Sequence, residues 1–301
     1  MRVNVIDHNE RSNLQSPTVW LPHSMEDAVE QMRRLGSDAC FISGGTLLQI
    51  GWENGHHRPE HLISLDAISS LKEVHVLDEK SSLVIGAFTS LAQCRKHPII
   101  KKVFPLMSDA VRLIASPAIR TRGTIGGNIM SGIGDLIPLL LATKADLIFF
   151  THYGEKKINL WEWIKQGERV KDALLTQIVI PAMSESAAKN LFFKKIGRRE
   201  SFIAAIVTVS GMIVKTDLGI VNEVRLAAGG GENKPILLER TEALLKGKES
   251  EKIDWKAVYR TICDEFNPVT DAFVTAEYRK KVAANLIIAE LKNGLQSDAI
   301  V

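Results

Sequence analysis

Cysteine is scarce in this sequence, and its three residues are far apart. Cys40, Cys94 and Cys263 form no Cys-x-x-Cys pair and no Cys/His ligand spacing. Thiolate ligands of zinc or of an iron–sulfur cluster come in such closely spaced groups. The sequence therefore predicts no metal site within this chain. The thiols are expected to be reduced and partly buried, as in a cytosolic protein.

Long apolar runs and an excess of one charge are also missing. The longest strongly apolar stretch, Leu136 to Ala142, is too short to span a bilayer, and residues 1–13 lack the apolar core of a signal peptide. With 38 basic and 35 acidic residues, the net charge of +3 gives no support for nucleic-acid or anionic-membrane binding. We expect a cytoplasmic protein with no membrane span and no nucleic-acid partner.

Two common phosphate-binding motifs are absent as well. The chain has neither the G-x-G-x-x-G of a dinucleotide-binding Rossmann loop nor the Gly-Lys-Ser/Thr of a P-loop. His56, His57 and His61 lie close together, but no carboxylate or cysteine nearby completes a persuasive ligand set. This pattern favours a solvated loop over a metal site.

Glycine, by contrast, is concentrated in residues 116–143. Five glycines fall between Gly123 and Gly134, and the apolar run follows at once. Because glycine has no Cβ, its N–H group can approach a ligand closely, and a row of such groups forms a concave anion site. Asn128 and Asp135 add side chains that can bond amides or hydroxyls. The stretch is consistent with a loop that binds a nucleotide pyrophosphate, although composition alone favours tight turns between buried strands.

A second glycine pair follows a short strand expected at residues 39–42. Ser43-Gly44-Gly45-Thr46 is a second candidate for phosphate contact, because the backbone amides and a hydroxyl can donate to oxygen. On its own this pattern is weak, since glycine pairs after strands have many structural causes.

The length of 301 residues predicts two or three domains. Apolar periodicity predicts a helix that is capped by Ser24 and ended by Gly36. The small, polar residues 182–190 predict a linker at a domain boundary. Beyond it, strands are followed by helices, which is typical of an α+β domain. The other expected strands are 61–66, 74–77, 83–85, 145–150, 174–180, 191–195, 202–214 and 221–228, with helices at 104–114, 239–245, 255–266 and 276–292.

Several segments match one family in order along nearly the whole chain. The most specific is Gly123-Thr124-Ile125-Gly126-Gly127-Asn128; the others are Ser43-Gly44-Gly45-Thr46, Ile114-Ala115-Ser116-Pro117-Ala118-Ile119-Arg120, Asp135-Leu136-Ile137-Pro138, Phe193-Lys194 before Arg198-Arg199, and Ala276-Glu277-Tyr278-Arg279. With these segments the chain resembles the FAD-binding medium subunit of the xanthine dehydrogenase/carbon monoxide dehydrogenase family of molybdenum hydroxylases.

The resemblance implies an α+β fold with a two-part FAD-binding region of the PCMH type, related to the vanillyl-alcohol-oxidase flavoproteins. This region would span residues 12–183, in lobes of about 12–66 and 67–183. A smaller domain of the CO dehydrogenase flavoprotein C-terminal type would span residues 190–298. Two departures from the family stand out: Leu47 replaces a common Asp, and the loop 129–134 is shorter than usual.

The resemblance also implies which residues bind FAD. Two segments would wrap the pyrophosphate, Asp135 would bond the ribityl or adjacent hydroxyls, Ile114 would lie in the cofactor cleft, and Leu175 and Lys194 would lie near the isoalloxazine. The pyrophosphate residues are Phe41, Ile42, Ser43, Gly44, Gly45, Thr46, Leu47, Leu48, Thr124, Ile125, Gly126, Gly127 and Asn128. No catalytic acid or base is expected, and no metal ligand.

The implied activity is electron transfer in a cytoplasmic heterotrimer. A molybdopterin-containing large subunit would oxidise the substrate, and a [2Fe–2S] small subunit would pass electrons through FAD to NAD⁺ or another acceptor. The substrate could be a purine, carbon monoxide, nicotinate or an aldehyde. Two alternatives stay open: a stand-alone FAD-dependent reductase or oxidase of the same fold, and a non-enzymatic α/β protein whose glycines serve only turns.

Overall fold

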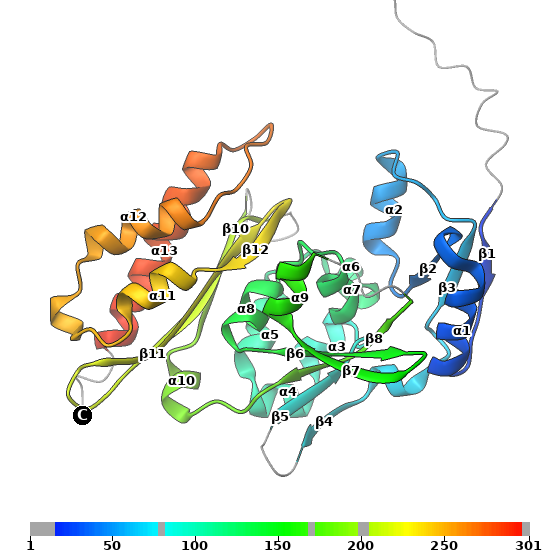
Figure 1. Cartoon of the computed structure of the whole chain (residues 1–301), viewed down its shortest axis with the longest axis horizontal. Coiled ribbons are helices and arrows are strands. Elements are labelled where there is room, and N and C mark those ends of the chain that lie inside the picture. Colours follow the sequence, from blue (N-terminus) through cyan, green and yellow to red (C-terminus); the bar gives the residue numbers. More distant parts are fainter. Residues whose placement is uncertain (1–15, 78–81, 168–171, 198–204, 297–301) are drawn as a thin grey trace, which may run out of the picture.

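The computed structural model describes residues 16–77, 82–167, 172–197 and 205–296, and Figure 1 shows three sheets that follow one another along the chain. Three parts of the sequence discussed above lie outside these ranges: residues 1–13, the connection 78–81 between the strands expected at 74–77 and 83–85, and the pair Arg198-Arg199. Within the described ranges, no helix combines the length and the apolar character needed to cross a bilayer.

The first lobe is a three-stranded parallel sheet in the order β1-β3-β2. Its helix α1 begins and ends as predicted: the Asp27 N–H donates to Ser24 Oγ at 3.1 Å, and Gly36 has a φ of +65°. One face of α1 packs on Ile63 of the sheet. The elements are β1 (Thr18–Trp20), α1 (Met25–Leu35), η2 (Gly36–Asp38), β2 (Ala39–Ile42), α2 (Thr46–Glu53), β3 (His61–Ser64) and η3 (Ser69–Lys72).

The second lobe is a five-stranded antiparallel sheet in the order β4-β5-β8-β6-β7, with short helices around it. The apolar run Leu136 to Ala142 is fully buried here and belongs to the largest hydrophobic core. The elements are β4 (Val74–Leu77), β5 (Ser82–Gly86), α3 (Leu91–Lys96), α4 (Pro98–Val103), α5 (Pro105–Arg112), α6 (Pro117–Arg122), α7 (Ile125–Met130), α8 (Ile137–Ala142), β6 (Asp146–Thr151), β7 (Gly154–Asn159), α9 (Leu160–Gln166) and β8 (Leu174–Ile180).

The C-terminal domain is a four-stranded antiparallel sheet in the order β12-β11-β10-β9. The strands expected at 202–214 and 221–228 correspond to β10 and β11, which pair with Thr208 opposite Gly229. Helix α8 contacts β10, β11 and β12, and Figure 1 shows α11, α12 and α13 on the opposite side of this sheet. The elements are α10 (Glu185–Lys189), β9 (Phe192–Gly197), β10 (Ala205–Lys215), β11 (Val221–Gly230), β12 (Asn233–Leu237), α11 (Glu239–Leu245), η4 (Ser250–Lys252), α12 (Trp255–Glu265) and α13 (Ala276–Gln296).

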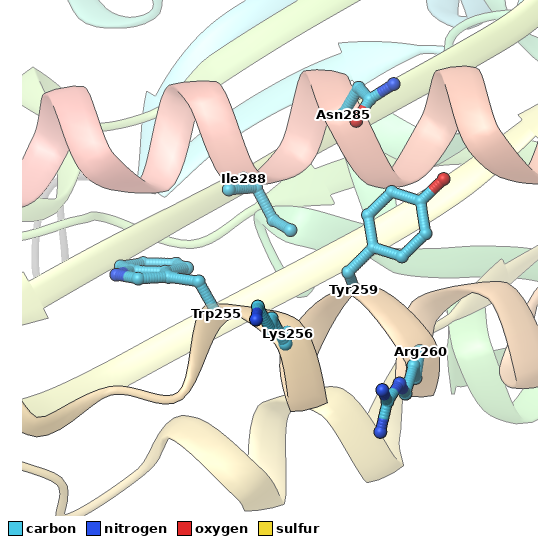
Figure 2. Close-up of a pocket in the computed structure, with 6 residues that line it drawn as sticks. All are labelled: Trp255, Lys256, Tyr259, Arg260, Asn285 and Ile288. Carbon is cyan, nitrogen blue, oxygen red and sulfur yellow. The ribbon is translucent and has the colours of Figure 1, made fainter.

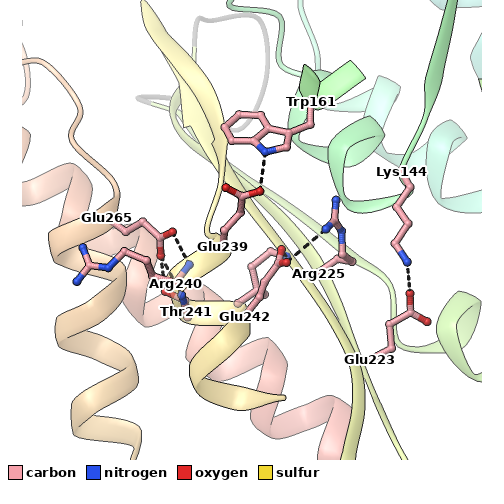
Figure 3. A network of polar contacts seen from close by, with 10 residues as sticks. Lys144, Trp161, Glu223, Arg225, Glu239, Arg240, Thr241, Glu242 and Glu265 are labelled. Carbon is pink, nitrogen blue, oxygen red and sulfur yellow. Dashed lines mark hydrogen bonds and ion pairs between the residues drawn. The ribbon is translucent and has the colours of Figure 1, made fainter. Parts of the chain in front are cut away.

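Polar contacts join this domain to the second lobe, as Figure 3 shows. Lys144, just after α8, pairs with Glu223 of β11 at 2.6 Å. The indole Nε1 of Trp161 on α9 donates to Glu239 of α11 at 2.9 Å. Both pairs are partly exposed, so each adds at most about 1 kcal/mol, and the burial of α8 against the sheet dominates the contact.

The predicted α+β class is confirmed. The segment expected as a linker, residues 182–190, connects β8 of the second lobe to β9 of the C-terminal domain, but it is partly helical. It contains α10, whose first turn is capped because the Ala187 N–H donates to Ser184 Oγ at 3.2 Å. Small polar residues suit a helix start as well as a loop. The polar sequence GEKKIN of the edge strand β7 does not predict a strand. This segment is extended because it pairs with β6.

Candidate cofactor site

The two glycine segments meet in the structure through residues 81 positions apart in sequence. Ser43 Oγ lies 3.0 Å from Thr124 Oγ1, and the Arg122 Nε–H donates to the Gly44 carbonyl at 3.4 Å. A Cβ on Gly44 would lie 2.0 Å from the Arg122 carbonyl oxygen. Gly44 is therefore required for the close approach of two main chains. We call residues 43–48 the first loop and residues 124–128 the second loop.

The first loop presents backbone N–H groups that the protein does not use. Gly45 has a φ of +69° and stands at the N-cap of α2, where no side chain caps the helix. From Gly44 to Leu48, no residue in the described part of the chain accepts a hydrogen bond from the backbone N–H groups. Such groups carry the positive end of the helix dipole, so this turn is suited to an anion such as a diphosphate.

The second loop differs from the row of free N–H groups that its glycines predict. Residues 125–130 form helix α7, and the side chain of Thr124 caps it by accepting from the Gly127 N–H at 3.0 Å. The Ile125 N–H donates to the Thr89 carbonyl at 3.0 Å, and the Gly126 N–H to the Ala87 carbonyl at 2.8 Å. The expected row of free N–H groups is therefore wrong for this segment, because its amides already have acceptors within the protein.

Of the short loop expected at 129–134, the first two residues end α7 and the others form a turn held by Asn128. The Asn128 Oδ1 accepts from the Leu136 N–H at 3.2 Å, and Ser131 Oγ donates to the Asn128 carbonyl at 2.7 Å. A Cβ on Gly134 would lie 2.1 Å from the same carbonyl oxygen. The side chain of Asn128 thus ties the second loop to the start of α8.

Asp135 lies between the second lobe and the C-terminal sheet. Its Oδ2 pairs with Lys195 Nζ at 2.7 Å, and its Oδ1 accepts from Thr208 Oγ1 at 3.3 Å. Only 6% of the Lys195 side chain and 14% of the Asp135 side chain are exposed. The sequence did not single out Lys195 or Thr208; they are opposite residues on β9 and β10, and only the strand register brings them together.

The remaining predicted residues fall into three places. Phe41 and Ile42 are half-buried at the end of β2, close to the first loop. Ile114 and Leu175 are buried in the largest core. Lys194 extends from the other face of β9 and pairs with Glu290 of α13 at 3.1 Å. Ile114 and Leu175 share this core with Ile125 of the second loop, whereas Lys194 lies away from it; the role of all three beside a flavin stays a prediction.

The side chain of Arg120 has a structural role within segment 114–120. Its Nη1 donates to the carbonyls of Ile114 at 2.8 Å and Ala115 at 2.5 Å, and it is 6% exposed. Ala115 has a φ of +47°, a conformation that a non-glycine residue rarely adopts. Burial, with Arg95 nearby, lowers the pKa of Arg120. The segment therefore positions the turn before α6.

Elsewhere the described residues offer no metal site. They contain no cluster of three or more histidine, cysteine or acidic side chains that could hold a metal ion. Burial raises the pKa of the Cys94 thiol from 9.0 to about 12, so this cysteine is neutral and structural. A hollow of about 350 Å³ lies in the C-terminal domain between α12 and α13, and Figure 2 shows Ile288 of α13 pointing towards Trp255 and Tyr259 of α12. It includes no predicted cofactor residue.

Comparisons with known proteins identify the family of the chain. Residues 12–183 match the family model described as the FAD binding domain in molybdopterin dehydrogenase, and residues 191–292 match the CO dehydrogenase flavoprotein C-terminal domain. The chain is 30% identical over 278 residues to the carbon monoxide dehydrogenase medium chain of Afipia carboxidovorans, covering 88% of this chain and 92% of that one. It is 26% identical over 273 residues to the medium chain from Hydrogenophaga pseudoflava, with 88% and 92% covered.

A solved structure supports the same relationship. The carbon monoxide dehydrogenase from Hydrogenophaga pseudoflava, in a form lacking the Mo-pyranopterin moiety of its molybdenum cofactor, contains a chain that superposes with a TM-score of 0.84. The identity is 26%, and the match covers 94% of this chain and 98% of that one. The chain therefore belongs to the FAD-binding medium subunits of the molybdenum hydroxylases, and it is a subunit of an oxidoreductase.

Proposed function

We propose that the first and second loops hold the diphosphate of FAD between them. The main support is the contact of the two loops at Ser43 and Thr124, next to a helix start whose N–H groups have no acceptor in the described chain. The first loop would donate hydrogen bonds, and the second would shape the site. Leu47 and Ile50 of α2 are each 50% exposed and offer apolar surface beside it.

The same proposal assigns the other predicted contacts. Asp135 would bond a ribityl or adjacent hydroxyl, because a carboxylate that already accepts from Lys195 and Thr208 still has lone pairs to accept more. Ile114 and Leu175 would lie on the flavin side. The prediction also includes Lys194, which here extends from the other face of β9 towards Glu290. The FAD-binding region would span residues 12–183 and the C-terminal domain residues 190–298, in a protein of the cytoplasm.

Bound FAD supplies chemistry that joins a one-electron donor to a two-electron acceptor. We propose that the donor is a [2Fe–2S] cluster in a small partner subunit, which receives electrons from a molybdenum-containing large subunit, and that the acceptor is NAD⁺ or another oxidant. The support is the similarity to medium chains of carbon monoxide dehydrogenases, one of which is described with a molybdenum cofactor. This chain binds and orients the flavin; its partner would select the substrate.

Flavin content of the purified chain tests the proposal. We expect visible flavin absorbance from one FAD per chain in the wild type, and loss of most of it in Gly127→Val. A Cβ at Gly127 lies 3.1 Å from Thr124 Oγ1 and 3.4 Å from Ser43 Oγ, so small shifts allow folding while the side chain fills the site.

The matched control is Gly294→Val, because a Cβ there also lies 3.1 Å from a side chain, that of Ile213, but in the C-terminal domain. It should keep its flavin. A colourless wild-type protein that does not take up added FAD, or unchanged flavin in Gly127→Val, would refute the proposed site.

A further inference from the structure

The link between Asp135 and Lys195 is the most deeply buried ion pair between the second lobe and the C-terminal domain in the described chain. Its two side chains are 14% and 6% exposed, whereas those of Glu223 and Lys144 in the other pair are 36% and 50% exposed. A buried lysine without a partner carries a large desolvation cost, so its position depends on the carboxylate.

The pair is also connected to the second loop. Asp135 is bonded to Leu136, whose N–H donates to Asn128 Oδ1 at 3.2 Å, and Asn128 is the last residue of the loop. On the other side, Lys195 and Thr208 are register partners in the C-terminal sheet. A short chain of contacts therefore runs from β9 and β10, through Asp135, to the loop.

We propose that Lys195 is a positioning residue for the flavin site: it acts through Asp135 to fix the turn 131–136 and to neutralise the carboxylate next to the cofactor. The inference rests on the proposed FAD site. It distinguishes Lys195 from its neighbour Lys194, which extends from the opposite face of β9 towards Glu290. The C-terminal domain thereby contributes to the cofactor site through one cation.

The charge of Asp135 determines the direction in which the flavin midpoint potential changes. Without Lys195, Asp135 would stay in its half-buried place with no cation, and an unpaired negative charge beside the flavin disfavours the negative charge that reduction adds. The flavin midpoint potential should fall. The loosened turn should also weaken FAD binding, by about tenfold or about 1.4 kcal/mol, as expected for directly coupled groups.

The experiment measures FAD affinity and flavin midpoint potential in the full chain for Lys195→Met, with Lys144→Met as the matched control. Both substitutions remove a lysine that joins the same two parts of the protein, but Lys144 is 50% exposed and Lys195 only 6%. The midpoint potential is therefore the deciding measurement, because a purely structural role of Lys195 would not lower it. We expect weaker FAD binding and a lower potential only in Lys195→Met. Equal changes in the two variants, or no change in Lys195→Met, would overturn the inference.

Two further variants keep the test decisive if Lys195→Met does not fold. Lys195→Arg keeps the cation, and the double variant Asp135→Asn with Lys195→Met removes both charges. The double variant should bind FAD more weakly than Lys195→Arg but return the potential towards the wild-type value. Equal affinity in these two variants would overturn the inference. A wild type without FAD would instead refute the proposed cofactor site itself.

Discussion

The two glycine segments look alike in sequence, but their backbone N–H groups are used differently in the structure. In the first loop, the backbone N–H groups from Gly44 to Leu48 have no acceptor in the described chain. In the second loop, the N–H groups of Ile125, Gly126 and Gly127 donate hydrogen bonds to other protein atoms. The first loop is therefore able to donate hydrogen bonds to a ligand, and the second loop supports the first. Glycine pairs indicate close approach of main chain, but whether to a ligand or to another loop depends on where the N–H groups point.

The largest expected effect comes from the glycine at which the loops touch. In Gly44→Ala the new Cβ would meet the Arg122 carbonyl, a main-chain atom, so the two loops must separate. We expect loss of FAD binding and a destabilisation of about 1–3 kcal/mol, in the range of overpacked cores. Flavin content and denaturant unfolding measure both. Retention of full FAD affinity would show that the contact between the loops is dispensable.

A smaller effect is expected from the support loop. Thr124→Ala removes the cap of α7 and the partner of Ser43, so stability should fall by about 1 kcal/mol, as for a lost N-cap. FAD affinity should fall less than in Gly44→Ala, because the donors of the first loop remain. Thermal unfolding with and without FAD separates the two effects. If Thr124→Ala abolished binding while Gly44→Ala did not, the roles of the two loops would be reversed.

The sequence predicted the elements whose signals are local. Ser24 and Gly36 mark the ends of α1, and a mainly apolar segment ended by Pro181 located β8. It also located both loops, because family segments surround them. It missed β7, a polar edge strand defined by its partner, and it did not predict that residues 125–130 are helical. A helix with two glycines has a poor intrinsic propensity, and burial of Ile125 and Ile129 overrides it.

The pairing of Lys195 with Asp135 could not be read from the sequence either. Two neighbouring lysines on a strand face opposite sides, but which of them faces the second lobe depends on the packing of α8 against the sheet. The family resemblance implies Lys194 as the residue near the flavin, whereas the structure pairs Lys195 with the predicted cofactor residue Asp135.

Hydrogen exchange of the full chain with and without FAD tests the comparison most directly. The account predicts that FAD slows exchange of the backbone amides from Gly44 to Leu48, which have no acceptor in the described chain, much more than that of Ile125, Gly126 and Gly127, which are already bonded. Unchanged exchange in the first loop while FAD is bound would contradict it.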